Sequence, residues 1–221
     1  MVKISTLFLL TISAISFGQV KDSVASKKVK TDLYVGFGAQ VQDDLNINKN
    51  LRFKNLPEVQ KVISEFVVGM NVFGEKFSGA GEFGFMYSNP EKNGSKNKYY
   101  AFNSRLKFHY NLINEEKIAF TSGINIASTA STLDVYSSSN TIDLNDLEPN
   151  NNSGHLNLRN QMYYAGPSLS VYLFRKSFPI QINAAYEIGF TRGRWKSDFG
   201  SVLNTVNESG KNRFVFGITL L

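Results

Sequence analysis

The stretch YAFNSRLKFHYN, residues 100–111, alternates apolar and polar side chains along its whole length. One of its faces is apolar apart from Ser104, while the other carries cations and amides. A repeat of two residues is the period of a β-strand, whose successive side chains point to opposite sides. The stretch therefore predicts a strand with an apolar face of Tyr100, Phe102, Leu106, Phe108 and Tyr110 and a polar face of Asn103, Arg105, Lys107, His109 and Asn111.

The same alternation recurs in seven other segments, whose polar faces carry glycines, amides and charges. Pro167 lies within one of them. Because proline cannot donate a ladder hydrogen bond, it predicts a bulge or a local gap in pairing there. The seven further predicted strands are residues 32–42, 63–73, 77–88, 118–129, 163–173, 180–191 and 213–220.

The connections between these segments alternate in length. The short ones are residues 74–76, 113–116 and 174–178, and the long ones are 43–62, 89–98, 130–157 and 192–212. Tight turns at one end and long loops at the other are typical of a transmembrane barrel. The pattern predicts an all-β fold: a closed, eight-stranded, antiparallel up-and-down transmembrane β-barrel over residues 31–221.

Two barrels fit the alternation. In a soluble barrel of the lipocalin kind, the apolar face is the core; in a membrane barrel, that face contacts lipid. An eight-stranded barrel has an interior only wide enough to be filled by side chains, and the many Phe and Tyr rings would overfill it. The membrane barrel is also favoured by glycines on the polar face and by aromatic side chains at both ends of the apolar band, Tyr87, Tyr99, Tyr100, Tyr163 and Trp195 at one and Phe77, Tyr110, Phe120 and Phe178 at the other.

The N-terminal segment has the pattern of a secretory signal peptide. Lys3 provides the positive charge, residues 4–17 are mostly apolar, and Ser16 and Gly18 are the small residues that precede a cleavage site. We predict a signal peptide over residues 1–18, cleavage between Gly18 and Gln19, and a flexible leader over residues 19–30.

Composition narrows the function classes. The chain has no cysteine, which excludes disulfides and thiolate metal sites. Its formal net charge is +6, but the basic residues do not cluster on one patch, so nucleic-acid binding is disfavoured. Attraction to anionic lipid head groups fits the charge better.

The signal peptide, the eight alternating strands and the alternating loop lengths together resemble the small outer-membrane barrels typified by the OmpA transmembrane domain. The resemblance covers residues 31–221. It implies a cell outer-membrane location in a Gram-negative envelope, export by signal peptide and a monomeric barrel. It also implies outer-membrane lipid, lipopolysaccharide and the barrel assembly machinery as partners.

The polar face places six ionisable side chains inside the barrel. They could form a gate or selectivity filter whose ion pairs exchange partners. A fixed network that satisfies buried charges is the favoured interpretation, because an unpaired buried charge is very costly. The six residues are Glu65, Glu82, Arg105, Lys107, Glu187 and Arg213.

A second candidate site is the rim of the long-loop end. Arg192, Arg194 and Lys196 flank Trp195 there. These side chains could bind the phosphates of lipopolysaccharide, or they could anchor the barrel at the membrane interface, and the sequence leaves both open.

Catalysis and metal binding are disfavoured, and no cofactor is predicted. Ser104 and His109 lie on opposite faces of one strand, and His109 and His155 are not spaced as metal ligands. The acidic residues of the third long loop suit Ca²⁺ by type but lack EF-hand spacing, so a solvated loop is favoured; they are Asp134, Asp143, Asp146 and Glu148.

The function favoured by the sequence is a structural or surface-interaction role through the extracellular loops, without enzyme activity. The alternative is a narrow porin or carrier for small solutes, and a membrane-embedded enzyme comes third. The barrel interior distinguishes the structural role from the porin or carrier. A continuous polar path favours transport, and a plugged interior favours a scaffold.

Overall fold

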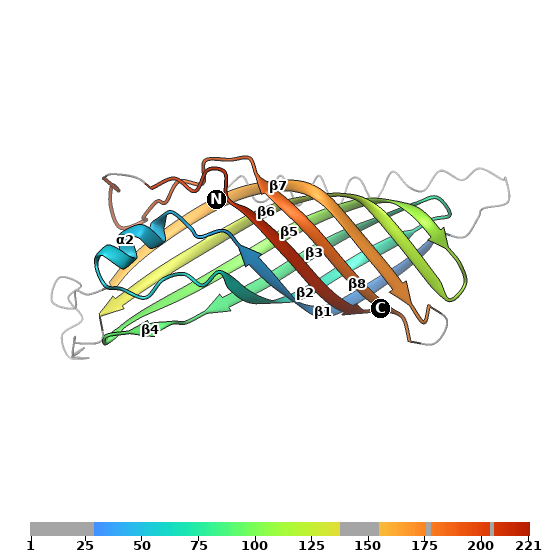
Figure 1. Cartoon of the computed structure of the whole chain (residues 1–221), viewed down its shortest axis with the longest axis horizontal. Helices are drawn as coiled ribbons and strands as arrows, with labels where there is room; N and C mark the ends of the chain where they lie inside the picture. Colours follow the sequence, from blue (N-terminus) through green and yellow to red (C-terminus); the bar gives the residue numbers. More distant parts are fainter. Residues whose placement is uncertain (1–28, 138–154, 176–177, 204–205) are drawn as a thin grey trace.

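The computed structural model describes residues 29–137, 155–175, 178–203 and 206–221. These residues form a barrel of strands with one short helix at one end (Figure 1). The elements are β1 Lys30–Gln42, α2 Ile47–Phe53, β2 Val62–Phe73, β3 Phe77–Ser88, β4 Glu91–Lys92, β5 Ser95–Asn114, β6 Ile118–Ser137, β7 His155–Leu173, β8 Ile180–Gly189 and β9 Asn212–Leu220.

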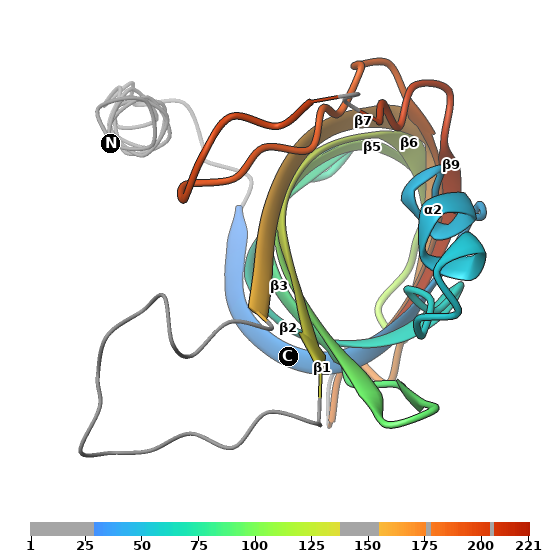
Figure 2. The same ribbon diagram turned by 90° about the vertical axis from the view of Figure 1, so that its left-hand side faces the viewer.

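The strands close into a ring. Each of the long strands pairs antiparallel with the next one along the chain, β3 pairs with β5, and β9 pairs back onto β1. The two-residue β4 only extends β5 as a hairpin, so the ring itself has eight strands. Figure 2 looks along this ring from the end at which α2 lies. The predicted eight-stranded, closed, antiparallel barrel is confirmed.

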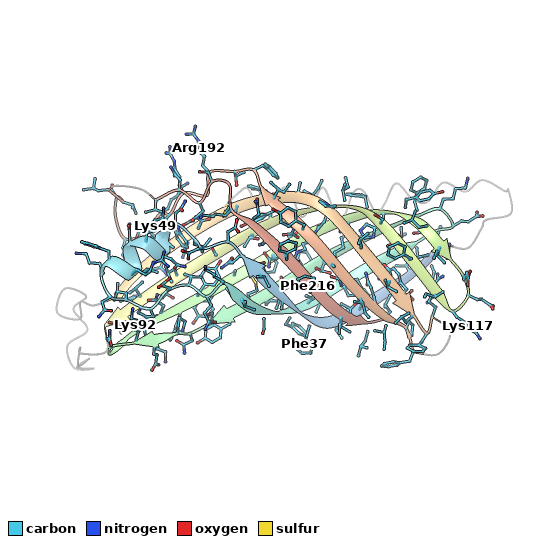
Figure 3. All side chains as sticks on the ribbon, in the orientation of Figure 1. Phe37, Lys49, Lys92, Lys117, Arg192 and Phe216 are labelled. Carbon is cyan, nitrogen blue, oxygen red and sulfur yellow. The ribbon has the colours of Figure 1, made fainter. Side chains whose placement is uncertain are left out.

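The apolar faces of the strands point out of the barrel. Phe37 is 72% exposed and Phe216 is 49% exposed, although both lie in the middle of strands. Figure 3 shows these two rings on the outer wall, with Lys49 and Lys92 toward the α2 end and Lys117 at the opposite end. The polar faces point inward and are buried. The membrane assignment of the two faces is therefore confirmed against that of a soluble barrel.

Within the described ranges, no helix is long and apolar enough to span a bilayer.

Three strands are much longer than the rest. β5 and β6 have 20 residues each and β7 has 19, whereas β8 has 10 and β9 has 9. A tilted strand crosses a bilayer in about 9–11 residues, so β5–β7 continue beyond the membrane at the end that carries the long connections, called the loop end here (Figure 1). The prediction of loops was wrong for residues 95–98, 130–137 and 155–157, which belong to these strands.

The extension of β5–β7 has the opposite polarity to the rest of the barrel. On β6, Leu133 and Val135 point inward and Asp134 points outward, whereas nearer the turns Asn125 points inward and Ile126 outward. Apolar side chains of β5, β6 and β7 thus form a concave apolar surface beyond the membrane.

An apolar cluster, called the lid here, covers this concave surface. It joins side chains of α2 and its flanking loop to those of the extension, and its members are Leu45, Ile47, Leu51, Val59, Ile63, Met86, Tyr99, Ala101, Leu133, Val135, Leu158 and Trp195. The long connection 43–62, predicted as a loop, therefore contains a helix whose Ile47 and Leu51 are buried in the lid, while Phe53 at its end is exposed.

The predicted gap at Pro167 is confirmed. Tyr164 and Ala165 pair with Gly189 and Ile188 of β8, and pairing resumes at Ser168. The register is the same on both sides, so no residue is inserted. On the other side, Pro167 remains paired with Ile124 of β6.

Candidate functional site

The centre of the barrel is a ring of ion pairs around Arg105. Its guanidinium Nη1 lies 3.0 Å from Oε1 of Glu82, and its Nε lies 3.2 Å from Oε1 of Glu187. Its Nη2 lies 2.9 Å from Oε2 of Glu65, an ion pair without hydrogen-bond geometry. Arg105 is 1% exposed. One planar cation therefore joins carboxylates from the neighbouring strands β2 and β3 to one from β8, three strands away from β2 around the ring.

Two further cations complete the network. Lys107 Nζ lies 2.7 Å from Oε2 of Glu82, and Arg213 Nε contacts Oε2 of Glu187. Arg213 also donates to Thr129 Oγ1 at 2.8 Å, and its guanidinium lies 3.8 Å from the centre of the Tyr164 ring. The three cations match the three carboxylates in charge, so the network is formally neutral. All six side chains expected to project into the barrel lie in it and are buried.

Strand register explains part of this convergence. Glu82 lies directly opposite Arg105 on the β3–β5 pair, and Glu187 lies directly opposite Arg213 on the β8–β9 pair. Directly opposed residues lie on the same face with their Cβ atoms about 5 Å apart. Two ladder pairs of opposite charge therefore face each other across the barrel.

Two glycines make room for the network. A Cβ at Gly84 would lie 1.9 Å from Oε1 of Glu65, and one at Gly69 would lie 2.4 Å from Cζ of Tyr34. The Tyr34 hydroxyl uses this space to donate to Oε2 of Glu82 at 3.0 Å. These two inward glycines therefore accommodate large polar side chains.

Neutral side chains satisfy further oxygens of the carboxylates. Asn125 Nδ2 donates to Oε1 of Glu187 at 2.6 Å, and Asn103 Nδ2 donates to Oε1 of Glu65. A buried charge that is paired and hydrogen-bonded in this way is held in place, because any movement would leave it unsatisfied. The geometry is that of a fixed network.

The lid closes the interior above the network. Trp195 is 2% exposed, and its Nε1 donates to Oε1 of Glu208 at 2.8 Å. The same buried carboxylate accepts from the backbone N–H groups of Asn46 and Ile47, at 2.5 and 2.9 Å, at the start of α2. Glu208 thus ties together the two long connections that fold over the loop end. Sequence reasoning missed it because its spacing marks no motif.

A small cavity separates the lid from the network. It has a volume of about 10 Å³ and touches Leu45, Tyr99, Thr129, Trp195 and Arg213. That is the volume needed for a single water molecule.

The turn end of the interior is filled as well. The rings of Phe73 and Tyr172 meet edge to face with centroids 5.1 Å apart, and the Arg175 guanidinium lies 4.5 Å from the Phe73 ring centre. Above them, Gln181 accepts from Asn71 at 3.1 Å and donates to Ser170 at 3.2 Å. These side chains leave the network covered from both ends.

His109 lies between these layers. Its Nδ1 is 2.7 Å from Thr121 Oγ1, and its Nε2 is 2.6 Å from Ser168 Oγ. Ser104, on the opposite face of β5, does not meet it, as expected. The contact with Ser168 was not foreseen, since it depends on the register between β5, β6 and β7.

The rim residues do not act as one group. Arg192, Arg194 and Lys196 are exposed, whereas Trp195 between them points into the lid. The expectation that Trp195 contacts lipid or lipopolysaccharide at the rim is therefore wrong, and Tyr99, placed with it among the interfacial aromatics, is also buried in the lid. The reason is the reversed polarity of the loop end, where the inward face is the apolar one.

The remaining expectations concern the third loop and the N-terminus. Asp134 accepts from Asn157 and pairs with His155 at 3.0 Å, and His155 stacks on Tyr136. Asp143, Asp146 and Glu148 lie outside the described residues, as do Gly18 and Gln19 of the predicted cleavage site. Within the described ranges, no group of acidic or histidine side chains is arranged to hold a metal ion.

A closed antiparallel ring with an apolar outer belt, a polar interior and long connections at one end defines the class of outer-membrane β-barrels. The sequence matches no family model and no curated protein.

Solved structures of similar shape include the attachment invasion locus protein Ail of Yersinia pestis, with a TM-score of 0.48 and 8% identity over 86% of this chain and 96% of that one. Neisserial surface protein A has a TM-score of 0.44 and 9% identity over 86% and 98% of the two chains. CarO of Acinetobacter baumannii has a TM-score of 0.35 and 11% identity over 84% and 96%.

Proposed function

We propose that this chain is a non-conducting outer-membrane barrel that presents its folded loop end at the cell surface for contact with other molecules. The observation that carries the proposal is the doubly sealed interior. Charged side chains fix one another in the middle, and an apolar lid covers them at the loop end. A narrow porin would need a continuous polar path through the same space.

The lid also supports a surface role. Its apolar side chains give the loop end a core of its own, which holds α2 and the extension of β5–β7 in a defined shape. A defined surface outside the membrane is suited to recognition, because less ordering free energy is lost on binding than for unstructured loops.

Conductance in planar bilayers tests the sealed interior. The purified full-length mature barrel is expected to give no steady channels. Steady channels that Arg105→Ala abolishes or alters would overturn the proposal in favour of the narrow porin or carrier. Arg192→Ala, which removes an exposed cation outside the network, is the matched control.

Labelling of intact cells tests the orientation. Because the chain has no cysteine, Lys92→Cys at the loop end and Lys117→Cys in a turn each introduce a unique thiol (Figure 3). A membrane-impermeant maleimide is expected to label Lys92→Cys in intact cells and Lys117→Cys only after lysis. The reverse pattern would overturn the placement of the loop end at the cell surface.

A further inference from the structure

A groove of about 1060 Å³ lies on the outer wall of the barrel where the membrane-spanning part meets the extension. Tyr87, Tyr100 and Tyr163 line it, and side chains of this kind collect at the level of lipid head groups. The groove therefore lies at the membrane interface of the loop end and outside the sealed interior.

The floor of the groove is formed by β6. Its outward side chains change from Ile124 and Ile126 to Ser128, Ala130 and Thr132, so the wall becomes thinner there. Large side chains on the neighbouring strands stand on both sides of this floor. Phe102 of β5 pairs with Ala130, which pairs in turn with Gln161 of β7.

One side of the groove is aromatic and the other is basic. Phe85, Tyr87, Tyr100 and Phe102 line the first, and Arg159, Arg194 and Lys196 line the second. Such a groove offers an apolar surface next to a cluster of cations, which matches a molecule with a hydrocarbon part and an anionic head.

Backbone pairing builds the basic side. Lys196 and Arg159 exchange both backbone hydrogen bonds, at 2.7 and 2.9 Å, so that Lys196 lies directly opposite Arg159 at the outer end of β7. Directly opposed residues project from the same face. Arg194 lies two residues before Lys196, is also exposed, and is held by its own bridge to Asn207.

This arrangement places like charges side by side. Like charges directly opposite each other on neighbouring strands are destabilising. The positive charge of Arg159 is offset by an ion pair with Asp198. Arg194 and Lys196 have no ion pair within the part of the chain that the structure describes. An anion bound between these side chains would relieve the repulsion.

We propose that this groove binds a phosphorylated glycolipid of the lipid A type, with phosphate held by Arg194, Lys196 and Arg159 and acyl chain packed over Ala130 and Phe102. The assignment rests on the proposed function in one respect, because the loop end must face the outer leaflet. Guanidinium and ammonium groups at head-group level are suited to phosphate. A head group with more than one phosphate matches a cluster of several cations better than a phospholipid does.

Binding of lipid A to the mature barrel in neutral detergent, followed by native mass spectrometry and by titration, tests the proposal. The double variant Arg194→Gln/Lys196→Gln is expected to bind lipid A at least about tenfold more weakly than the wild type. Ala130→Phe, which fills the floor and changes no charge, is expected to weaken binding as well. Arg192→Gln, an exposed cation that does not line the groove, is the matched control and is expected to leave binding unchanged.

The choice of lipid separates the possible ligands. Dephosphorylated lipid A, phosphatidylglycerol and inorganic phosphate are expected to bind more weakly than lipid A at the same ionic strength. Equal binding of phosphatidylglycerol, or equal affinity of the double variant and the Arg192→Gln control, would overturn the proposal. Heat-modifiable migration on an SDS gel checks that every variant is a folded barrel.

Failure of this inference is distinguishable from failure of the proposed function. Lipid A binding in detergent depends neither on conductance nor on orientation in the cell. A conducting barrel that binds lipid A would overturn only the proposed function. A sealed barrel with its loop end outside and no preference for lipid A would overturn only the groove.

Discussion

Two regions of the barrel interior differ although the same three strands line both. At membrane level, β5–β7 direct Arg105, Asn125 and Ser168 inward, and these side chains are buried among charges and amides. Beyond the membrane, the same strands direct Tyr99, Leu133 and Leu158 inward, and these form an apolar lid.

The difference follows from what lies outside the wall. At membrane level the outer face meets hydrocarbon, so apolar side chains point out and the polar ones are left for the interior. Beyond the membrane the outer face meets water, and apolar side chains are buried as in a soluble protein. Along one strand, the apolar side chains therefore change from the outward to the inward positions at the membrane boundary. This boundary lies near Tyr100, Thr132 and Arg159.

The largest effect is expected from breaking the charged interior. Arg105→Met leaves the carboxylates of Glu65, Glu82 and Glu187 close together without their central cation. Breaking a buried ion pair by removing one partner costs about 3–5 kcal/mol, so the free energy of unfolding is expected to fall by at least that amount. Urea unfolding in lipid vesicles, followed by the gel shift, measures it. Arg192→Met is the control, and equal stability of the two variants would mean that the network does not hold the barrel together.

The apolar lid is expected to be the next most sensitive region. Leu133 is 0% exposed, and Leu133→Ala is expected to cost about 2–5 kcal/mol through the cavity it leaves. Trp195 is the only tryptophan of the chain and lies in the same cluster, so its fluorescence reports on the lid directly. A red shift is expected in Leu133→Ala and none in Leu169→Ala on the lipid-facing wall. An unshifted Leu133→Ala spectrum would contradict a packed lid.

A third pair of variants locates the membrane boundary along β7, where the outward face changes from apolar to polar. Leu169 and Asn157 both point outward, Leu169 at membrane level and Asn157 on the extension. A lysine on the lipid face costs about 2–4 kcal/mol near the bilayer midplane and about 0–1 near the interface. Leu169→Lys is therefore expected to lower the unfolding free energy far more than Asn157→Lys, whose ammonium would lie beside Asp134. Equal costs in vesicle refolding would place both positions on the same side of the boundary.

The smallest effect is expected at Asp44, in the loop that leads to α2. Hydrogen bonds from Asn48 and Arg52 hold the pKa of this carboxyl below its usual 3.8. Because the folded-state pKa is depressed, the contribution is present above pH 3.8 and is lost as the pH falls through the folded value. The carboxylate is well solvated, so the effect is small.

Hydrogen exchange of residues 47–53 in wild type and Asp44→Asn measures this contribution. Protection is expected to differ between them at neutral pH and to converge below the folded pKa. A difference that persists in acid would show that the carboxylate's charge is not involved.

Sequence reasoning predicted the ring, its strand order and its membrane-facing wall because these follow from local alternation, from the lengths of the connections and from the limited volume of the interior. The inward direction of Arg105 and Glu187 follows from period two. The 3.2 Å contact between them does not follow from the sequence pattern, because it depends on which strands lie opposite one another once the barrel closes.

The lid was missed for a related reason. In residues 130–137 the apolar positions Leu133 and Val135 lie in the opposite phase to Ile124 and Ile126. With a single phase assumed for each strand, the expected pattern of apolar and polar side chains ends before this segment, and the segment is interpreted as a loop. Tyr99 was misplaced by the same assumption. The signal in the sequence is a shift of the apolar side chains from even-numbered to odd-numbered positions within one continuous strand.

The seam between β1 and β9 bears on how the chain reaches this shape. Val35 pairs with Leu220 and Gln42 with Arg213, so the last strand bonds to the first. Bringing such distant residues together is entropically costly, and it yields hydrogen bonds only after almost the whole polypeptide is in place. Until then β1 and β9 are edge strands with unpaired backbone groups, which are energetically costly in hydrocarbon. A catalyst of insertion would act on this barrel by covering these two edge strands until they pair.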